Sequence, residues 1–332
     1  MAAITILGGG GWGTALSGLL AEKGHTVTLW VRHSFTADLL RRERTNERHL
    51  PGVLLPSNLQ ITSSFAEMSS ADYLLWATPS TALGEIARSL LESKYLTKNS
   101  VMVSCVKGLD HQRYRRMTEI LEDVFPEIST AVLSGPNHAE EVARSIPSAT
   151  VIASREPEIA EHLQSILSTK TFRVYTSADV VGVEIGGALK NIFALGAGLC
   201  DGLGLGDNSK AAFVTRSLAE LIRIGTALGG RRETFQGLSG VGDLVGTCFS
   251  RHSRNRGVGE RLARGEPLDH ITESMGTVAE GIPTTRSAIH LGERLSVETP
   301  IIREIHSILY GSIPPAEAMQ RLLARDLRPE ED

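Results

Sequence analysis

The stretch ILGGGGWGTA, residues 6–15, decides the fold of the N-terminal half. A short apolar run ends in this stretch, and a helix-like pattern follows it. Within it, Gly8, Gly10 and Gly13 form the string G-x-G-x-x-G. That string indicates a dinucleotide-binding turn when it joins a strand to a helix in the first βαβ unit of a chain.

Each of the three glycines has its own physical role in such a turn. Gly8 lets the chain turn tightly, Gly10 lets backbone N–H groups approach a pyrophosphate, and Gly13 lets the helix pack closely on the strand. The helix N-terminus then adds partial positive charge next to the phosphates. The stretch therefore predicts a dinucleotide site.

The first half of the chain alternates short apolar runs with helical patterns. Several runs are continuous rather than alternating, as in strands buried on both faces. We expect strands at Ala3–Leu7, Thr26–Val31, Leu59–Thr62, Tyr73–Ala77, Val101–Val106, Ala131–Leu133, Ala149–Ala153 and Phe172–Tyr175. We expect helices at Thr14–Glu22, around Leu83–Leu91 and around Arg115–Val124. This alternation of strands and helices predicts an α/β fold with a Rossmann-like, doubly wound sheet.

After about Ser177 helical periodicity dominates, and no run there reads as a strand. The helices predicted there are Val180–Leu199, Ser209–Leu228, Arg254–Arg264, Thr284–Arg294, Pro300–Leu309 and Pro315–Ala324. We therefore expect a dinucleotide-binding domain at 1–177 and an all-helical substrate and catalytic domain at 178–332.

Composition excludes several classes of protein. The 332 residues carry a net charge of −4, which does not indicate a nucleic-acid partner. Cys105, Cys200 and Cys248 lie far apart without CxxC spacing, so neither a disulfide framework nor a metal site is expected. No apolar stretch reaches membrane-spanning length, and no signal peptide is recognisable. These features together predict a cytoplasmic protein.

The end of the second predicted strand bears on the choice of dinucleotide. NAD-binding proteins usually place Asp or Glu there to bond the ribose 2′-hydroxyl. This chain has Arg32 and His33 instead. A cation at this point suits the 2′-phosphate of NADP, although a solvated loop arginine has the same appearance. We expect NADP(H), with NAD(H) as a second cofactor.

Three segments of the second half contain candidate chemistry. Lys190 lies in a helical pattern rich in glycine, which costs helix stability and indicates close approach of another backbone or a ligand. A lysine in that setting is expected to be partly buried and able to act as an acid or base. Asp243 is the acid in a second glycine-dense segment. Arg254 and Asn255 offer donors for a phosphate or carboxylate, although an arginine-rich helix start that is merely solvated fits the spacing equally well.

The order of these motifs resembles the NAD(P)-dependent glycerol-3-phosphate dehydrogenases of the soluble bacterial type. The resemblance rests on the glycine loop with its tryptophan, then VKG, SGPNHAEEV, GGALKN, GVGDLVGTC and SRNR. It covers nearly the whole chain. It implies reversible reduction of dihydroxyacetone phosphate to sn-glycerol 3-phosphate, which supplies the glycerophospholipid backbone. It also implies an active site between the two domains and a homodimer.

The resemblance assigns roles residue by residue. It implies catalytic roles for Lys190, Lys107 and Asp243, with Lys190 as acid/base. The implied cofactor contacts are Gly8, Gly10, Gly11, Trp12, Gly13, Arg32, His33, Lys107, Ala139, Arg254, Val278 and Glu280. The implied substrate contacts are Lys107, Gly135, Asn137, Lys190, Asn191, Asp243, Ser253, Arg254 and Asn255.

Two positions depart from the family pattern. Asn137 stands where the family has Ser or Thr, and Gly11 stands where it often has Ser.

Two other functions remain open from the residues alone. One is a related hydroxy-acid dehydrogenase of the 6-phosphogluconate type. The other is a catalytically silent NADP-binding regulator, against which the presence of Lys107, Lys190, Asp243 and Arg254 together argues.

Overall fold

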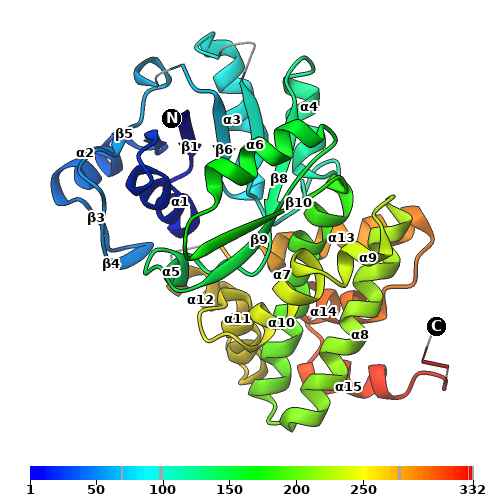
Figure 1. The fold of residues 1–332 in the computed structure, drawn as a ribbon. Helices are drawn as coiled ribbons and strands as arrows, with labels where there is room; N and C mark the ends of the chain where they lie inside the picture. Colours follow the sequence, from blue (N-terminus) through cyan, green and yellow to red (C-terminus); the bar gives the residue numbers. More distant parts are fainter. Residues whose placement is uncertain (69, 97–99, 276–277, 328, 331–332) are drawn as a thin grey trace.

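The protein consists of a sheet domain followed by a helical domain (Figure 1). The computed structural model describes residues 1–68, 70–96, 100–275, 278–327 and 329–330. Strands β8 (Thr130–Ser134) and β9 (Ser148–Ser154) lie against the long helix α7 (Val180–Gly202), and several helices of the helical domain pack on the other sides of α7. Past Ser177 the described part of the chain contains helices and no strand, as the periodicity predicts.

The sheet has eight strands in the order β10-β9-β8-β7-β6-β1-β2-β5. The strands are β1 (Ala3–Leu7), β2 (Thr26–Trp30), β5 (Gln60–Thr62), β6 (Tyr73–Trp76), β7 (Val101–Ser104), β8 (Thr130–Ser134), β9 (Ser148–Ser154) and β10 (Phe172–Ser177). All neighbours pair in parallel except β8 and β9. The doubly wound sheet is confirmed. The antiparallel pair is a feature that the apolar runs do not predict, because strand direction leaves no trace in a run buried on both faces.

Side chains of one strand alternate between two hydrophobic cores, one on each face of the sheet. Tyr73 and Leu75 of β6 belong to the core that includes α1 (Gly11–Glu22) and α6 (Pro157–Leu167). Leu74 and Trp76 belong to the core that includes α3 (Ser80–Ser93) and α4 (Met117–Val124). Helices thus cover both faces, and the carboxyl ends of β1, β6 and β7 meet at one edge.

Some short elements of the sheet domain are not predicted. These are α2 (Ser34–Glu43), α5 (Ala139–Val142) and the hairpin formed by β3 (Thr45–Asn46) and β4 (Leu50–Leu54). Asn46 of the hairpin donates to the Gly9 carbonyl oxygen at 3.0 Å and to Thr14 Oγ1 at 2.8 Å. The hairpin is therefore held by contact with the glycine loop rather than by its own strand propensity.

The helical domain is built around α7. Its other elements are α8 (Gly206–Ala227), α9 (Arg232–Phe235), the π-helical turn η2 (Leu238–Gly242), α10 (Asp243–Phe249), α11 (Arg254–Ala263), α12 (Leu268–Met275), α13 (Gly281–Leu295), α14 (Pro300–Tyr310) and α15 (Pro315–Leu323). The helix α7 is long and apolar enough to cross a membrane, but 94% of that apolar window is buried inside the protein. We assign α7 to the core of the domain.

The glycines of α7 allow other backbones to approach it. A Cβ at Gly198 would lie 1.9 Å from the Arg256 carbonyl oxygen of α11, and one at Gly186 would lie 2.4 Å from the Ser239 carbonyl oxygen of η2. The predicted close approach is thus confirmed as backbone packing. It fixes α10 and α11, which contain Asp243 and Arg254, against the helix that contains Lys190.

Candidate active site

The glycine loop lies between the end of β1 and the start of α1. Gly8 has a φ of +124°, and a Cβ there would lie 2.5 Å from the Ala77 carbonyl oxygen. A Cβ at Gly13 would lie 1.9 Å from the Gly8 carbonyl oxygen, whereas Gly10 has nothing within 4 Å of that position. No side chain caps the start of α1 at Gly10. The loop therefore fits a pyrophosphate, because it leaves open space in front of an uncapped helix N-terminus.

The β3–β4 hairpin and α5 close around this loop. A Cβ at Gly11 would lie 2.7 Å from the His49 carbonyl oxygen and 3.6 Å from the Ala139 Cβ. Trp12 packs its ring against Phe172, with 6.2 Å between ring centroids. Because this partly buried side chain packs against the core of the sheet domain, we expect Trp12 to offer a ligand its backbone. The position of His49 is not predicted from the sequence, where nothing distinguishes it from a loop histidine.

At the end of β2, Arg32 and His33 lie at the surface. Arg32 NH2 forms an ion pair with Glu85 Oε1 of α3 at 2.9 Å. His33 occupies the N-cap position of α2 without a capping side-chain bond. Both residues thus border the edge of the sheet where the second strand of a dinucleotide fold meets the ribose.

Two lysines share one buried carboxylate. Lys107 Nζ lies 2.7 Å from Asp243 Oδ2, and Lys190 Nζ donates to Asp243 Oδ1. Lys107 follows β7, Lys190 lies on α7 and Asp243 begins α10. The Lys107, Lys190 and Asp243 side chains are 16%, 6% and 2% exposed. The structure therefore brings together all three residues for which the family resemblance implies catalysis.

Neutral acceptors complete the surroundings of the two ammonium groups. Lys107 Nζ also donates to the Gly135 carbonyl oxygen at 2.7 Å and to Asn137 Oδ1 at 2.6 Å. Lys190 Nζ donates to Thr247 Oγ1 at 2.7 Å. The asparagine thus supplies the polar group expected at position 137, with an amide in place of a hydroxyl. Thr247 is missed by the sequence reasoning, although it lies four residues after Asp243 and hence on the same face of a helix.

Burial changes the acidity of one lysine. Loss of hydration lowers the pKa of Lys107 to about 7; the Asp243 carboxylate opposes this shift and the Lys190 ammonium adds to it. Lys107 therefore titrates near neutral pH, between an ammonium that attracts anions and a neutral amine.

A chain of amides links the lysines to the helical domain. Asn191 Nδ2 donates to the Lys107 carbonyl oxygen at 2.8 Å. Asn255 Nδ2 donates to Asn191 Oδ1 at 2.9 Å, and Asn255 Oδ1 accepts from Gly281 N at 2.9 Å. Asn191 and Asn255, expected as substrate contacts, thus join α7, α11 and α13 around the site.

The N-terminus of α11 lies beside this chain. Ser253 is its N-cap, and the Ser253 hydroxyl accepts from Arg256 N at 3.2 Å. Arg254 NH1 donates to the Val278 carbonyl oxygen at 3.1 Å. These contacts leave most of the guanidinium donors of Arg254 available to an anion.

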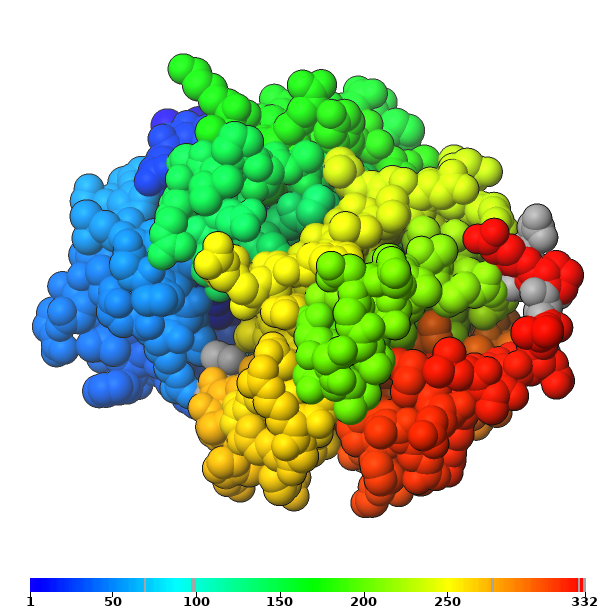
Figure 2. Space-filling model, turned by 90° about the horizontal axis from the view of Figure 1, so that it is seen from below, coloured from blue at the N-terminus to red at the C-terminus, as the bar shows by residue number. Residues whose placement is uncertain are grey.

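Glu280 connects the two domains. Its carboxylate accepts from Ser80 N at 3.0 Å and Ser80 Oγ at 2.5 Å, at the start of α3. Burial raises the pKa of Glu280, against these hydrogen bonds and the Arg254 charge. Figure 2 shows the face on which the blue segments of the sheet domain border the yellow and orange segments of the helical domain, with a hollow between them.

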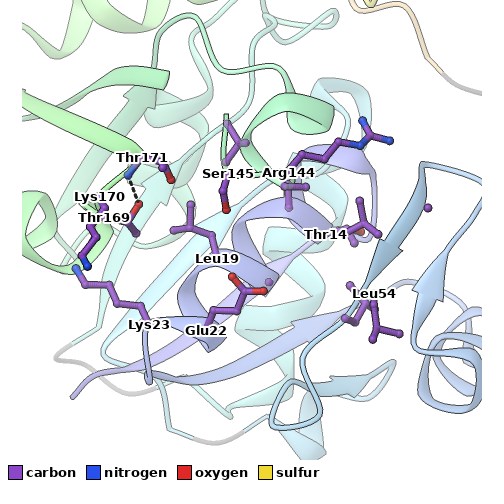
Figure 3. A pocket seen from close by; sticks show the side chains of 17 residues that line it. Thr14, Leu19, Glu22, Lys23, Leu54, Arg144, Ser145, Thr169, Lys170 and Thr171 are labelled. Atoms are coloured by element: carbon purple, nitrogen blue, oxygen red, sulfur yellow. Dashed lines mark hydrogen bonds between the residues drawn. The ribbon is translucent and has the colours of Figure 1, made fainter. Parts of the chain in front are cut away.

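A pocket of about 670 Å³ lies along α1, away from the lysine–aspartate cluster (Figure 3). It is lined by α1, β4, the end of α5 and the Thr169–Thr171 loop, and it contains none of the expected site residues. Lys23 at its rim donates to the carbonyl oxygens of Ile166 and Ser168 at the end of α6. This lysine therefore caps a helix.

A dinucleotide-type glycine loop in the sheet domain, together with a buried lysine–aspartate–lysine cluster formed by both domains, is typical of a nicotinamide-dependent dehydrogenase. The family profile described as NAD-dependent glycerol-3-phosphate dehydrogenase N-terminus matches residues 3–160, and the C-terminus profile matches residues 179–320. The chain belongs to the NAD(P)-dependent glycerol-3-phosphate dehydrogenase family.

Curated relatives and a solved structure agree with this assignment. The glycerol-3-phosphate dehydrogenase [NAD(P)+] of Carboxydothermus hydrogenoformans is 43% identical over 330 residues, 98% of each chain. That of Anaeromyxobacter dehalogenans is 45% identical over 331 residues, 98% of this chain and 99% of the relative. The crystal structure of the Coxiella burnetii glycerol-3-phosphate dehydrogenase matches with a TM-score of 0.94 at 35% identity, covering 98% of this chain and 99% of that one.

Proposed function

We propose that this protein catalyses the reversible reduction of dihydroxyacetone phosphate to sn-glycerol 3-phosphate with NADPH or NADH. The observation that carries the proposal is the Asp243 carboxylate holding Lys107 and Lys190 between the domains. The test is loss of the NADPH absorbance band when dihydroxyacetone phosphate is added. Turnover with this substrate supports the proposal. Turnover only with 6-phosphogluconate and NADP+ contradicts it.

In this mechanism the chain supplies charge and a proton at the substrate oxygen. A nicotinamide cofactor bound along the glycine loop would supply the hydride, and this transfer would place negative charge on the carbonyl oxygen. Lys190, the acid/base that the family resemblance implies, donates the proton to that oxygen. Asp243 and Thr247 hold the Lys190 ammonium in place. Lys107, with Gly135 and Asn137, seats the substrate.

The substrate phosphate is proposed to lie at the start of α11. Ser253, Arg254 and Asn255 surround this helix N-terminus, whose backbone N–H groups attract anions. The Arg254→Ala variant is expected to raise the KM for dihydroxyacetone phosphate by about tenfold or more, because a charge-assisted hydrogen bond is lost. Steady-state kinetics would measure it.

The residual rate with dihydroxyacetone, which has no phosphate, should stay unchanged in this variant when NADPH is saturating, because the proposed cofactor contact of Arg254 then does not limit the rate. Arg264→Ala is the matched control, since Arg264 lies at the other end of the same helix and pairs with Glu260. An equal loss on both substrates would show that the variant collapses the site.

A pH dependence follows from Lys107. Because the pKa of Lys107 is about 7, its ammonium is present below that pH and is lost as the pH rises. We expect kcat/KM for dihydroxyacetone phosphate to fall between about pH 7 and pH 8. Lys107→Met should remove this descending limb and lower the plateau. A wild-type profile that stays flat from pH 6 to 9 would contradict the role of Lys107.

The cofactor is proposed to lie along the glycine loop. The backbone of Gly8, Gly10, Gly11, Trp12 and Gly13 contacts its pyrophosphate, which the open space at Gly10 supports. The proposed contacts elsewhere are Arg32 and His33 at the adenosine end and Lys107, Ala139, Arg254, Val278 and Glu280 around the rest of the cofactor. The Ser80–Glu280 contact supports closure of the helical domain over it.

Three further properties are proposed. The domain boundary falls between residues 177 and 178, supported by the end of β10 at Ser177 and the start of α7 at Val180. The protein is cytoplasmic, supported by three buried free cysteines. It forms a homodimer, supported by the resemblance to its family and tested by light scattering of the purified chain.

A further inference from the structure

The Arg32–Glu85 ion pair lies at the point where a dinucleotide fold distinguishes its two cofactors. Arg32 follows β2, and Glu85 lies on the second turn of α3, which follows β6. The two strands flank β1, so both side chains reach the same edge of the sheet. Their contact distance is 2.9 Å, and the side chains are 53% and 61% exposed. A bound ribose can therefore reach both groups.

The chain lacks an acidic residue at the end of β2, where NAD-binding proteins usually have one. Glu85 brings a carboxylate to that point from another helix, directly against Arg32. A carboxylate accepts a hydrogen bond from a ribose 2′-hydroxyl and repels a 2′-phosphate. The guanidinium beside it has the opposite preference.

We propose that Glu85 is a specificity-determining residue for the cofactor. Its carboxylate accepts the 2′-hydroxyl of NADH, and it competes with the 2′-phosphate of NADPH for Arg32. Arg88, three residues further on α3, lines a pocket of about 330 Å³ together with Glu85. This inference rests on the proposed role of Arg32 at the adenosine end.

The experiment is fluorescence titration of the full chain with NADPH and with NADH, so no substrate turnover is needed. Glu85→Gln keeps the shape and removes the charge. Half-exposed ion pairs contribute modestly, so we expect NADPH to bind about two- to fivefold more tightly and NADH about two- to fivefold more weakly. Glu92→Gln is the matched control, because Glu92 is an exposed glutamate on the same helix.

Arg32→Ala alone and combined with Glu85→Gln completes the test. The tighter binding of NADPH should disappear in the Arg32→Ala background, because the competition needs the guanidinium. An unchanged ratio of the two dissociation constants in Glu85→Gln would overturn the proposal. An equal change in Glu92→Gln, or a gain that persists without Arg32, would also overturn it. If dihydroxyacetone phosphate is not turned over, the proposed function fails, but these titrations still decide the role of Glu85.

Discussion

The Lys190→Ala variant is expected to lose a factor of about 10²–10⁴ in kcat for dihydroxyacetone phosphate, the usual contribution of general acid catalysis. The ammonium of Lys190 is buried against Asp243 and Thr247, and alanine leaves the carbonyl oxygen without a proton donor there. The affinity for NADPH, measured by fluorescence titration, should stay unchanged, because the glycine loop lies on the other domain. Steady-state kinetics with saturating cofactor gives kcat.

Lys170→Ala is a suitable control for this variant, since Lys170 is an exposed loop lysine away from the cluster. Addition of a small primary amine should restore part of the lost rate, because the cavity left by the side chain can admit it. A variant that loses NADPH affinity in parallel with kcat would indicate a structural role for Lys190 instead.

The second large effect is expected for Asp243→Asn. Its carboxylate is the shared counter-ion of Lys107 and Lys190, and removing it leaves two ammonium groups close together in a buried site. We expect the free energy of unfolding to fall by about 3 kcal/mol, as when one partner of a buried ion pair is removed. We expect kcat to fall by about 100-fold, because Lys190 loses its orientation.

Urea unfolding and steady-state kinetics measure the two effects. Asp207→Asn removes the same charge from an exposed position at the start of α8 and should change neither quantity. If Asp243→Asn kept both its stability and its kcat, the shared-carboxylate account of the site would be wrong.

The fold could be predicted from the sequence where local pattern and tertiary structure agree. The glycine loop lies between a strand and a helix, and β6 and β7 are continuous apolar runs. The β3–β4 hairpin could not be predicted, because its two strands are short and held by Asn46 against the glycine loop. The η2 turn could not be predicted either, because its five residues are too short a segment to show a helical periodicity.

The sequence identified most residues of the candidate site, but it did not predict the hydrogen bonds and ion pairs between them. Lys190 and Asp243 are 53 positions apart, and Lys107 and Asp243 are 136 apart. No local sequence pattern indicates that the Asp243 carboxylate forms ion pairs with both Lys107 and Lys190. Thr247 and Glu85 were missed for the same reason, because a threonine in a helix and a glutamate on a surface helix look ordinary until their partners are known.

The most direct test of the central claim, that Lys190 donates the proton, is the kcat of Lys190→Arg. Arginine keeps a positive charge beside Asp243 but holds its proton too tightly to donate it near neutral pH. The account predicts that kcat falls at least about 100-fold while NADPH affinity is retained. Retention of most of the wild-type kcat would contradict it, because Lys190 would then act only through its charge and the proton would come from another group.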